Sequence, residues 1–112
     1  MKEIKAIVQP FRLEAVCEAL EAIEGLPGLT VSQVAGWGKI QGREKGDVIE
    51  AGHTLAGKTK LEIVVPDEMV EPVVETIAST ARTGNIGDGK IFIYAVDDVL
   101  KIRTGERGAG AI

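Results

Sequence analysis

The chain of 112 residues contains few of the side chains on which catalytic and metal sites depend. It has one histidine, one cysteine, one tryptophan, one tyrosine and two phenylalanines. The single cysteine, Cys17, excludes an intrachain disulfide, and its place beside Val16 and Leu20 on an expected helical face is typical of a buried thiol. No Ser-His-Asp set, paired carboxylate site or cysteine–histidine nucleophile can be assembled, so we expect no enzymatic activity.

An excess of positive charge and long apolar runs are also missing. The 17 acidic and 13 basic residues give a net charge of −4, which argues against nucleic-acid binding, because phosphate neutralisation requires excess Lys and Arg. No apolar run approaches the ~20 residues of a membrane span, so we expect no membrane insertion. The N-terminus begins with Lys2 and Glu3 and has no apolar signal core, which predicts a cytoplasmic protein.

Hydrophobic periodicity predicts a β-α-β-β-α-β order within one domain. Short apolar runs at 3–9, 29–37, 61–65 and 90–96 indicate strands, and helical stripes run from Leu13 to Ile23 and from Val70 to Ala81. Pro72 requires that the second helix start loosely or close to it. This order defines the α+β, ferredoxin-like class, with two helices on one face of an antiparallel four-stranded sheet. The apolar content of the strands exceeds what one helix layer can hide, so we expect self-association.

Residues 83–90, Thr-Gly-Asn-Ile-Gly-Asp-Gly-Lys, form the most informative segment. Their three glycines allow positive φ angles and expose successive N–H groups, which can form a concave site for an anion. Lys90 ends the segment, and Lys101 and Arg103 follow one strand later, so phosphate is a suitable ligand. An Asp-Gly pair before an apolar run is also an ordinary hairpin turn, and the residues alone leave both interpretations open.

Between Gly38 and Lys60 no periodicity persists, and four glycines alternate with charged residues. A connection of this length in a compact domain is uncommon and is usually functional or mobile. We therefore expect a long exposed loop that joins two paired strands.

Together with the opening run 5–11 and the segment 64–67, residues 83–90 resemble the PII signalling family, and the resemblance covers nearly the whole chain apart from roughly residues 39 to 57. It implies one PII-like domain over 1–112 that forms a homotrimer. It also implies a T-loop at 39–57 that reaches a target membrane transporter or metabolic enzyme, a B-loop at 83–90 and a C-terminal segment at 101–112.

The resemblance further implies that ATP, ADP or AMP binds between subunits as a signalling ligand, with magnesium as an accompanying ion. In the family, the basic C-terminal positions reach the phosphates from a neighbouring subunit. The positions that match the family's site are Thr30, Gly36, Trp37, Gly38, Lys39, Lys58, Glu62, Val64, Gly87, Asp88, Gly89, Lys90, Lys101, Ile102 and Arg103.

Two departures from the family pattern fall in the expected T-loop. Lys39 and Ile40 stand where an arginine and a glutamine are usual. In the family that glutamine helps to coordinate the magnesium that joins ATP to 2-oxoglutarate, and isoleucine has no ligand atom. We therefore expect 2-oxoglutarate sensing to be weak or absent, unless Gln41 substitutes after a shift of register. The tyrosine that enteric relatives modify is also missing, since the only tyrosine, Tyr94, belongs to an expected strand.

Two alternative functions remain open on the sequence. The first is a metal-tolerance or metal-sensing trimer of the same fold, in which three copies of His53 form a site. A lone loop histidine more commonly has no such role. The second is a PII-like regulator linked to bicarbonate or inorganic carbon, because the altered loop suits a different effector. Acylphosphatases share the topology, but their N-terminal arginine cradle is absent.

Overall fold

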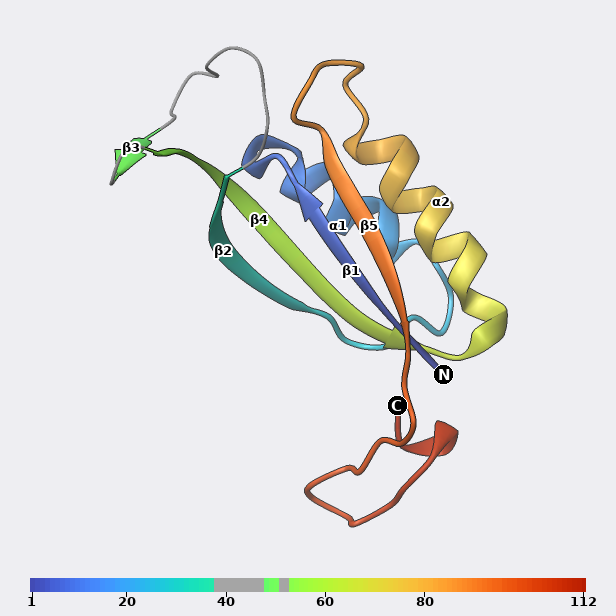
Figure 1. Ribbon diagram of the computed structural model, residues 1–112. Coiled ribbons are helices and arrows are strands. Elements are labelled where there is room, and N and C mark those ends of the chain that lie inside the picture. The colour runs from blue at the N-terminus through green and yellow to red at the C-terminus, as the bar shows by residue number, and fades with distance from the viewer. Residues whose placement is uncertain (38–47, 51–52) are drawn as a thin grey trace.

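The computed structural model describes residues 1–37, 48–50 and 53–112 (Figure 1). Two short 3-10 turns, Pro10–Arg12 and Asp67–Met69, each lead directly into a helix, and a third lies near the C-terminus. The regular elements are β1 (Lys2–Val8), α1 (Leu13–Glu21), β2 (Thr30–Gly36), β3 (Val48–Glu50), β4 (His53–Val65), α2 (Val70–Ala81) and β5 (Gly89–Ala95).

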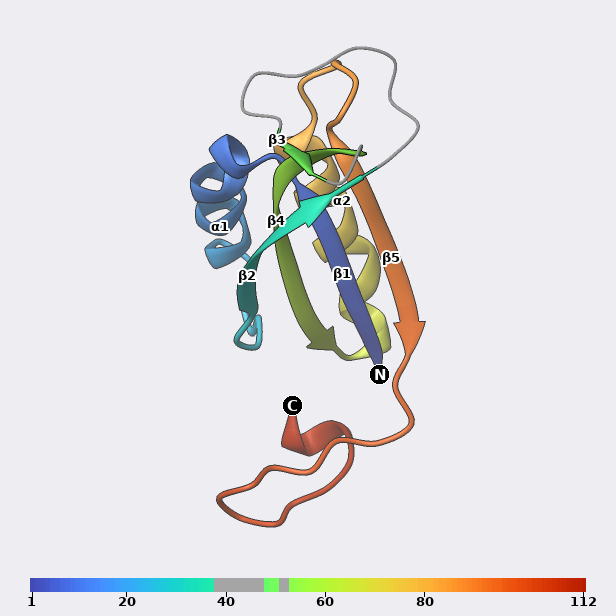
Figure 2. The ribbon, with the colours of Figure 1, turned by 60° about the vertical axis from the view of Figure 1, so that its left-hand side comes forward.

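The sheet is antiparallel with the order β2-β4-β1-β5, and β3 pairs only with the beginning of β4. Both helices lie on one face of this sheet (Figures 1 and 2). The predicted α+β, ferredoxin-like arrangement is therefore confirmed. Because β1 occupies a central position, β4 and β5 are both held in register through it.

The core lies between the sheet and the two helices. Every second residue of β1, starting at Ile4, is buried, and β4 shows the same alternation from Leu61 to Val65. These strand residues meet the buried stripes that periodicity predicted for the helices, namely Val16 and Leu20 of α1 and Val70, Val73, Ile77 and Ala81 of α2.

Pro72 is the third residue of α2, where a backbone N–H would have no intrahelical acceptor, so the ring is accommodated without a kink. The 3-10 turn Asp67–Met69 provides the loose start that its position required. A separate contact ties the two helices together at their ends. The guanidinium of Arg12 donates from both Nε and Nη2 to the carbonyl oxygen of Thr80, at 3.0 and 2.6 Å.

The sequence prediction was wrong about the length of one strand. It placed a compact strand at 61–65, whereas β4 begins at His53. Glycine at position 57 and charged residues at 58 and 60 obscured the pattern, yet the backbone pairs continuously with β2 from Gly36–Ala56 to Thr30–Glu62. The expected loop range 39–57 therefore contains β3 and the first residues of β4, while 39–47 and 51–52 lie outside the described residues.

Candidate functional site

The sheet face opposite the helices carries most of the charged strand residues. Side chains directly opposite each other in antiparallel strands share a face, so Lys5 of β1 lies between Glu62 of β4 and Phe92 of β5. Lys60 lies 3.5 Å from the carboxylate of Glu62, and the ammonium of Lys5 is 4.9 Å from the ring centre of Tyr94. This face thus carries charged side chains beside the exposed aromatic side chains of Phe92 and Tyr94.

The B-loop between α2 and β5 is held closed by one carboxylate. Asp88 accepts hydrogen bonds from the Thr83 N–H at 2.8 Å, from the Thr83 hydroxyl and from the Gly84 N–H at 2.9 Å. These contacts, the Thr83 hydroxyl first, hold the pKa of Asp88 below its ordinary value. Gly84, Gly87 and Gly89 all adopt positive φ angles, as the glycine spacing predicted. The Asp88 carboxylate therefore organises the loop.

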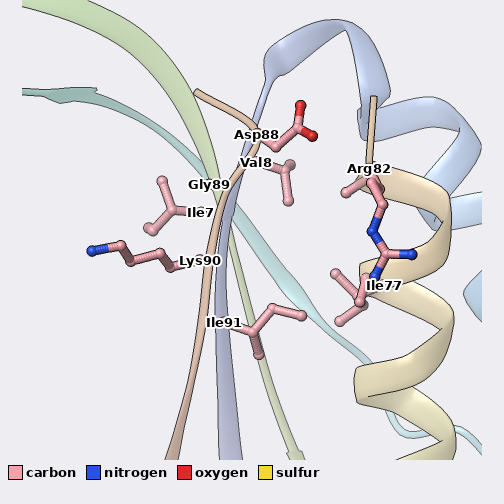
Figure 3. A pocket seen from close by; sticks show the side chains of 10 residues that line it. Ile7, Val8, Ile77, Arg82, Asp88, Gly89, Lys90 and Ile91 are labelled. Carbon is pink, nitrogen blue, oxygen red and sulfur yellow. The ribbon is translucent and has the colours of Figure 1, made fainter. Parts of the chain in front are cut away.

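Gly89 begins β5 at a point where no side chain fits. Its φ is +105°, and a Cβ placed there would lie 1.7 Å from the carbonyl oxygen of Ile7. The side chains of the following residues alternate between the two faces of the sheet, as in any β-strand. Figure 3 shows Ile7 and Lys90 pointing to one side of the sheet, while Val8 and Ile91 point to the other side, toward α2. The ammonium of Lys90 is thereby directed to the face that the helices leave uncovered.

A hollow of about 630 Å³ lies on this face beneath the B-loop. Lys58 contributes to it from β4; its side chain is only 8% exposed, and its ammonium donates to the Gly87 carbonyl oxygen at 3.0 Å. The hollow brings together seven of the site residues predicted from the sequence, namely Gly36, Trp37, Lys58, Gly87, Asp88, Gly89 and Lys90.

The hollow also includes residues that the sequence prediction missed. Ile7, Ala56, Asn85 and Phe92 line it. Sheet alternation could have found two of them, because Phe92 lies two residues after Lys90 on β5 and Ile7 is the β1 partner of Lys90. Ile7, Ala56 and Phe92 supply the apolar part of a cavity whose predicted members are mainly glycine and lysine.

A second hollow, of about 370 Å³, lies at the opposite end of the same face. It contains the remaining predicted strand residues Thr30, Glu62 and Val64, together with the C-terminal residues Ala111 and Ile112. On β1 this hollow is opposite Glu3, whereas Gly89 is opposite Val8. At about 3.3 Å per residue these outer ends are roughly 17 Å apart, and the two groups approach each other at Lys5, which pairs with both Phe92 and Glu62. The structure thus divides the predicted site into two parts.

Lys101, Ile102 and Arg103 belong to a C-terminal loop that projects from the end of the sheet opposite the B-loop (Figures 1 and 2). The ammonium of Lys101 lies 3.8 Å from the Glu106 carboxylate. Within the described part of the chain, the Arg103 guanidinium makes no hydrogen bond or ion pair, and the Ile102 side chain is 95% exposed. None of the three lines the hollow beneath the B-loop of its own chain.

Several predicted residues cannot be placed. Gly38, Lys39, Ile40, Gln41, Ala51 and Gly52 lie outside the described residues. His53 is described as the first residue of β4, where its backbone pairs with Glu50. Among the residues that the structure does describe, no group of three His, Cys, Asp or Glu side chains is arranged to hold a metal ion. Within the same ranges, no helix is long and apolar enough to span a membrane.

Comparison with known proteins gives a full-length match. Residues 1–106 match the family described as nitrogen regulatory protein P-II. The chain is 53% identical over 113 residues to nitrogen regulatory protein P-II 2 of Methanothermobacter thermautotrophicus, covering 100% of this chain and 97% of that protein. It is 47% identical to nitrogen regulatory protein P-II of Rhodospirillum rubrum and 48% identical to nitrogen regulatory protein P-II 1 of Escherichia coli K12, each with both chains fully covered.

The close approach at Gly89 predicts a severe effect of a single methyl group. We expect Gly89→Ala to lower the free energy of unfolding by more than about 3 kcal/mol, in the range of disruptive core changes, because the Ile7 backbone must move. Gly84→Ala is the matched control, since its φ is +89° but a Cβ there would meet nothing within 4 Å. Its cost should be that of the backbone conformation alone, about 1–2 kcal/mol. Equal losses in chemical denaturation would refute the steric argument.

The hydrogen bonds to Asp88 predict that the B-loop loosens in acid. Because the folded loop lowers the pKa of this carboxyl group, its contribution to loop order is complete above the ordinary aspartate pKa and is lost as the pH falls through the lower folded value. The amide signals of Thr83 and Gly84 in NMR spectra should report this transition. Asp88→Asn should abolish it, and a wild-type transition at or above the ordinary aspartate range would contradict the prediction.

Proposed function

The chain belongs to the nitrogen regulatory protein P-II family, and from this we propose that it is a signalling protein which binds adenine nucleotides between the subunits of a homotrimer. In this proposal the whole chain is one regulatory domain without enzymatic activity. It acts in the cytoplasm on a target transporter or metabolic enzyme through the T-loop at 39–57. The observation that carries the proposal is the division of the candidate site into two groups at opposite ends of one sheet face.

Within one chain the B-loop and the basic tail lie beyond opposite ends of β5, which spans Gly89–Ala95, or roughly 20 Å at about 3.3 Å per residue, so they cannot both contact the phosphates of one nucleotide. A head-to-tail ring solves this problem, because it brings the B-loop end of one subunit against the tail end of the next. The exposed apolar side chains support such an interface. Phe92 and Tyr94 on the free face, and Leu100 and Ile102 on the tail, are between 43% and 95% exposed, and a neighbouring copy would cover them.

The chemistry of the two groups suits a nucleotide. Lys90 and the N–H groups around Gly87 and Gly89 would bind phosphate oxygens from one subunit, and Lys101 and Arg103 from the next. Each charge-assisted hydrogen bond contributes about 1.5–3 kcal/mol, so three or four of them support micromolar affinity after the cost of association. Such an affinity suits the sensing of ATP, ADP or AMP.

The adenine base would lie against apolar residues of both subunits. Ile7 and Phe92 line the first hollow, and Val64 lines the second. In this proposal the backbone groups of Thr30 and Val64, which line the second hollow, would contact the base edge. Trp37, the only tryptophan of the chain, lines the first hollow, so its fluorescence should report nucleotide binding directly.

The described residues do not fit a magnesium ion that joins ATP to 2-oxoglutarate. The first hollow is lined by the cations Lys58 and Lys90, and the carboxylate of Asp88 already accepts hydrogen bonds from Thr83 and Gly84. Ile40 offers no oxygen ligand at the position where the family uses a glutamine. In the proposed site, no such ion links the nucleotide to an effector.

The inter-subunit arrangement predicts complementation between two defective variants. Lys90→Met and Arg103→Met trimers should each bind ATP about ten- to a hundredfold more weakly, because each loses a hydrogen bond to a charged group. In trimers assembled from a 1:1 mixture, about one quarter of the sites combine an intact Lys90 with an intact Arg103 and should recover wild-type affinity. Trp37 fluorescence and calorimetry measure the affinities.

The mixture distinguishes the two arrangements. If Lys90 and Arg103 of the same chain served one site, no mixed trimer would contain an intact site, and the mixture would titrate as the two defective parents do. A monomer mass by light scattering at micromolar concentration would also refute the proposal, because it requires a neighbouring subunit. The mass of each variant should equal that of the wild type.

The substitution at position 40 predicts that 2-oxoglutarate has little influence on ATP binding. Linkage requires an effector to raise ATP affinity by the same factor by which ATP raises the affinity for the effector. We expect calorimetric titration with magnesium to give the same ATP affinity with and without saturating 2-oxoglutarate. A tenfold rise, about 1.4 kcal/mol of coupling, would contradict this expectation. Parallel titrations with bicarbonate and with a divalent transition metal test the two alternative effectors.

A further inference from the structure

The Asp98 carboxylate closes the base of the C-terminal loop together with a backbone hydrogen bond, from the Gly108 N–H to the Val99 carbonyl oxygen at 3.0 Å. One oxygen of Asp98, Oδ2, accepts from the Nε and Nη2 atoms of Arg107, at 2.7 and 2.6 Å. The other oxygen, Oδ1, accepts from the Val99 N–H at 2.9 Å and the Gly108 N–H at 3.1 Å. The contacts join the two ends of the segment 98–108. The hydrogen bond from Arg107, the largest cause, holds the pKa of Asp98 below its ordinary value, so the carboxylate is charged at neutral pH.

The segment within this closure depends on hydrogen bonds for its shape. The Lys101 N–H donates to the Glu106 carbonyl oxygen at 2.8 Å, and the Gly105 N–H donates to the Lys101 carbonyl oxygen at 2.8 Å. No residue from 98 to 108 is buried, so the loop has no apolar core of its own. Val99, at the start of the loop, and Ala111, beyond its closure, line the hollow at this end of the sheet, and Ala111 is 5% exposed.

We propose that Asp98 and Arg107 are a positioning pair that holds the 98–108 loop folded before the ligand binds. Lys101 and Arg103 would then already be in place to contact the phosphates of a nucleotide bound at the neighbouring subunit. This inference rests on the proposed nucleotide site. An exposed ion pair contributes little to global stability. Its effect here is on binding, because a loop that must be ordered when the ligand arrives costs affinity that a preformed loop retains.

Direct phosphate binding by Arg107 is a different role, and the direction in which Asp98→Asn changes ATP affinity distinguishes it from the positioning role. If Arg107 itself bound phosphate, its contact with Asp98 would compete with the ligand, and Asp98→Asn would raise ATP affinity by releasing the guanidinium. If the pair positions the loop, the same variant lowers ATP affinity. The asparagine keeps the shape of the side chain and an oxygen that can accept from Val99, and it removes the charge that holds Arg107.

The experiment measures ATP and adenosine affinity for full-length trimers of the wild type, Asp98→Asn, Arg107→Met and the double variant. Each single variant should bind ATP roughly three- to tenfold more weakly, the range expected when a few side chains must be ordered on binding. The double variant should be no weaker than the weaker single variant. Adenosine affinity should not change, because the contacts to the adenine base are intact. The midpoint of thermal unfolding should not change, because the core is intact.

Asp97→Asn is the matched control, since it removes the same charge from the neighbouring position, where the carboxylate makes no hydrogen bond or ion pair with any described residue. It should leave ATP affinity at the wild-type value or slightly above it. Amide hydrogen exchange gives a readout that does not depend on nucleotide. Exchange at Gly108 should accelerate in Asp98→Asn and Arg107→Met, but not in Asp97→Asn.

A variant that lacks both phosphate-binding cations, Lys101 and Arg103, makes the test decisive. In Lys101→Met/Arg103→Met trimers, Asp98→Asn should cause no further loss of ATP affinity. A further loss there, a rise in ATP affinity, or wild-type affinity in both single variants would overturn the positioning role. If the wild type binds ATP and the cation variant binds it weakly, such a result leaves the proposed function intact. Absence of ATP binding by the wild type would overturn both.

Discussion

Strand β5 starts at Gly89, whose backbone lies so close to the Ile7 carbonyl of β1 that a methyl group cannot be placed between them. This contact fixes the side of the sheet on which Lys90 emerges and, through the alternation of the strand, the positions of Phe92 and Tyr94. It also holds the end of the B-loop against the central strand. The β1 and β5 side of the hollow beneath that loop therefore depends on this glycine, while Gly36, Ala56 and Lys58 line the hollow from β2 and β4.

The fold and one part of the site could be predicted from the sequence. Alternating burial in β1 and the stripes of α1 and α2 give strong local patterns, because one face of each element meets the core. The B-loop glycines were also recognisable, since Gly84, Gly87 and Gly89 adopt the positive φ angles that their spacing indicated. In each of these cases the cause lies within a few residues of the feature.

The remaining features depend on contacts between distant segments. The start of β4 at His53 is set by its backbone pairing with β2 and β3, which does not require an apolar pattern. Lys58 is buried because its ammonium reaches the Gly87 carbonyl oxygen across the sheet, and nothing in its own segment indicates this. The division of the site into two groups follows from which strand ends lie together. Sequence reasoning predicted one set of site residues and could not show that they lie in two groups on the sheet.

Strand β4 connects the two halves of the site with the segment that precedes it. The strand contributes Lys58 to the hollow under the B-loop, and it contributes Glu62 and Val64 to the hollow at the opposite end. The same strand begins at His53, in the hairpin with β3. In a ring, each β4 would therefore contact a nucleotide at each of two interfaces. In the proposed trimer, a change at either nucleotide would act on one continuous strand, whose first residues lie within the segment proposed as the T-loop. Under the proposed function, communication between neighbouring sites and the T-loop would need no contact beyond the sheet itself.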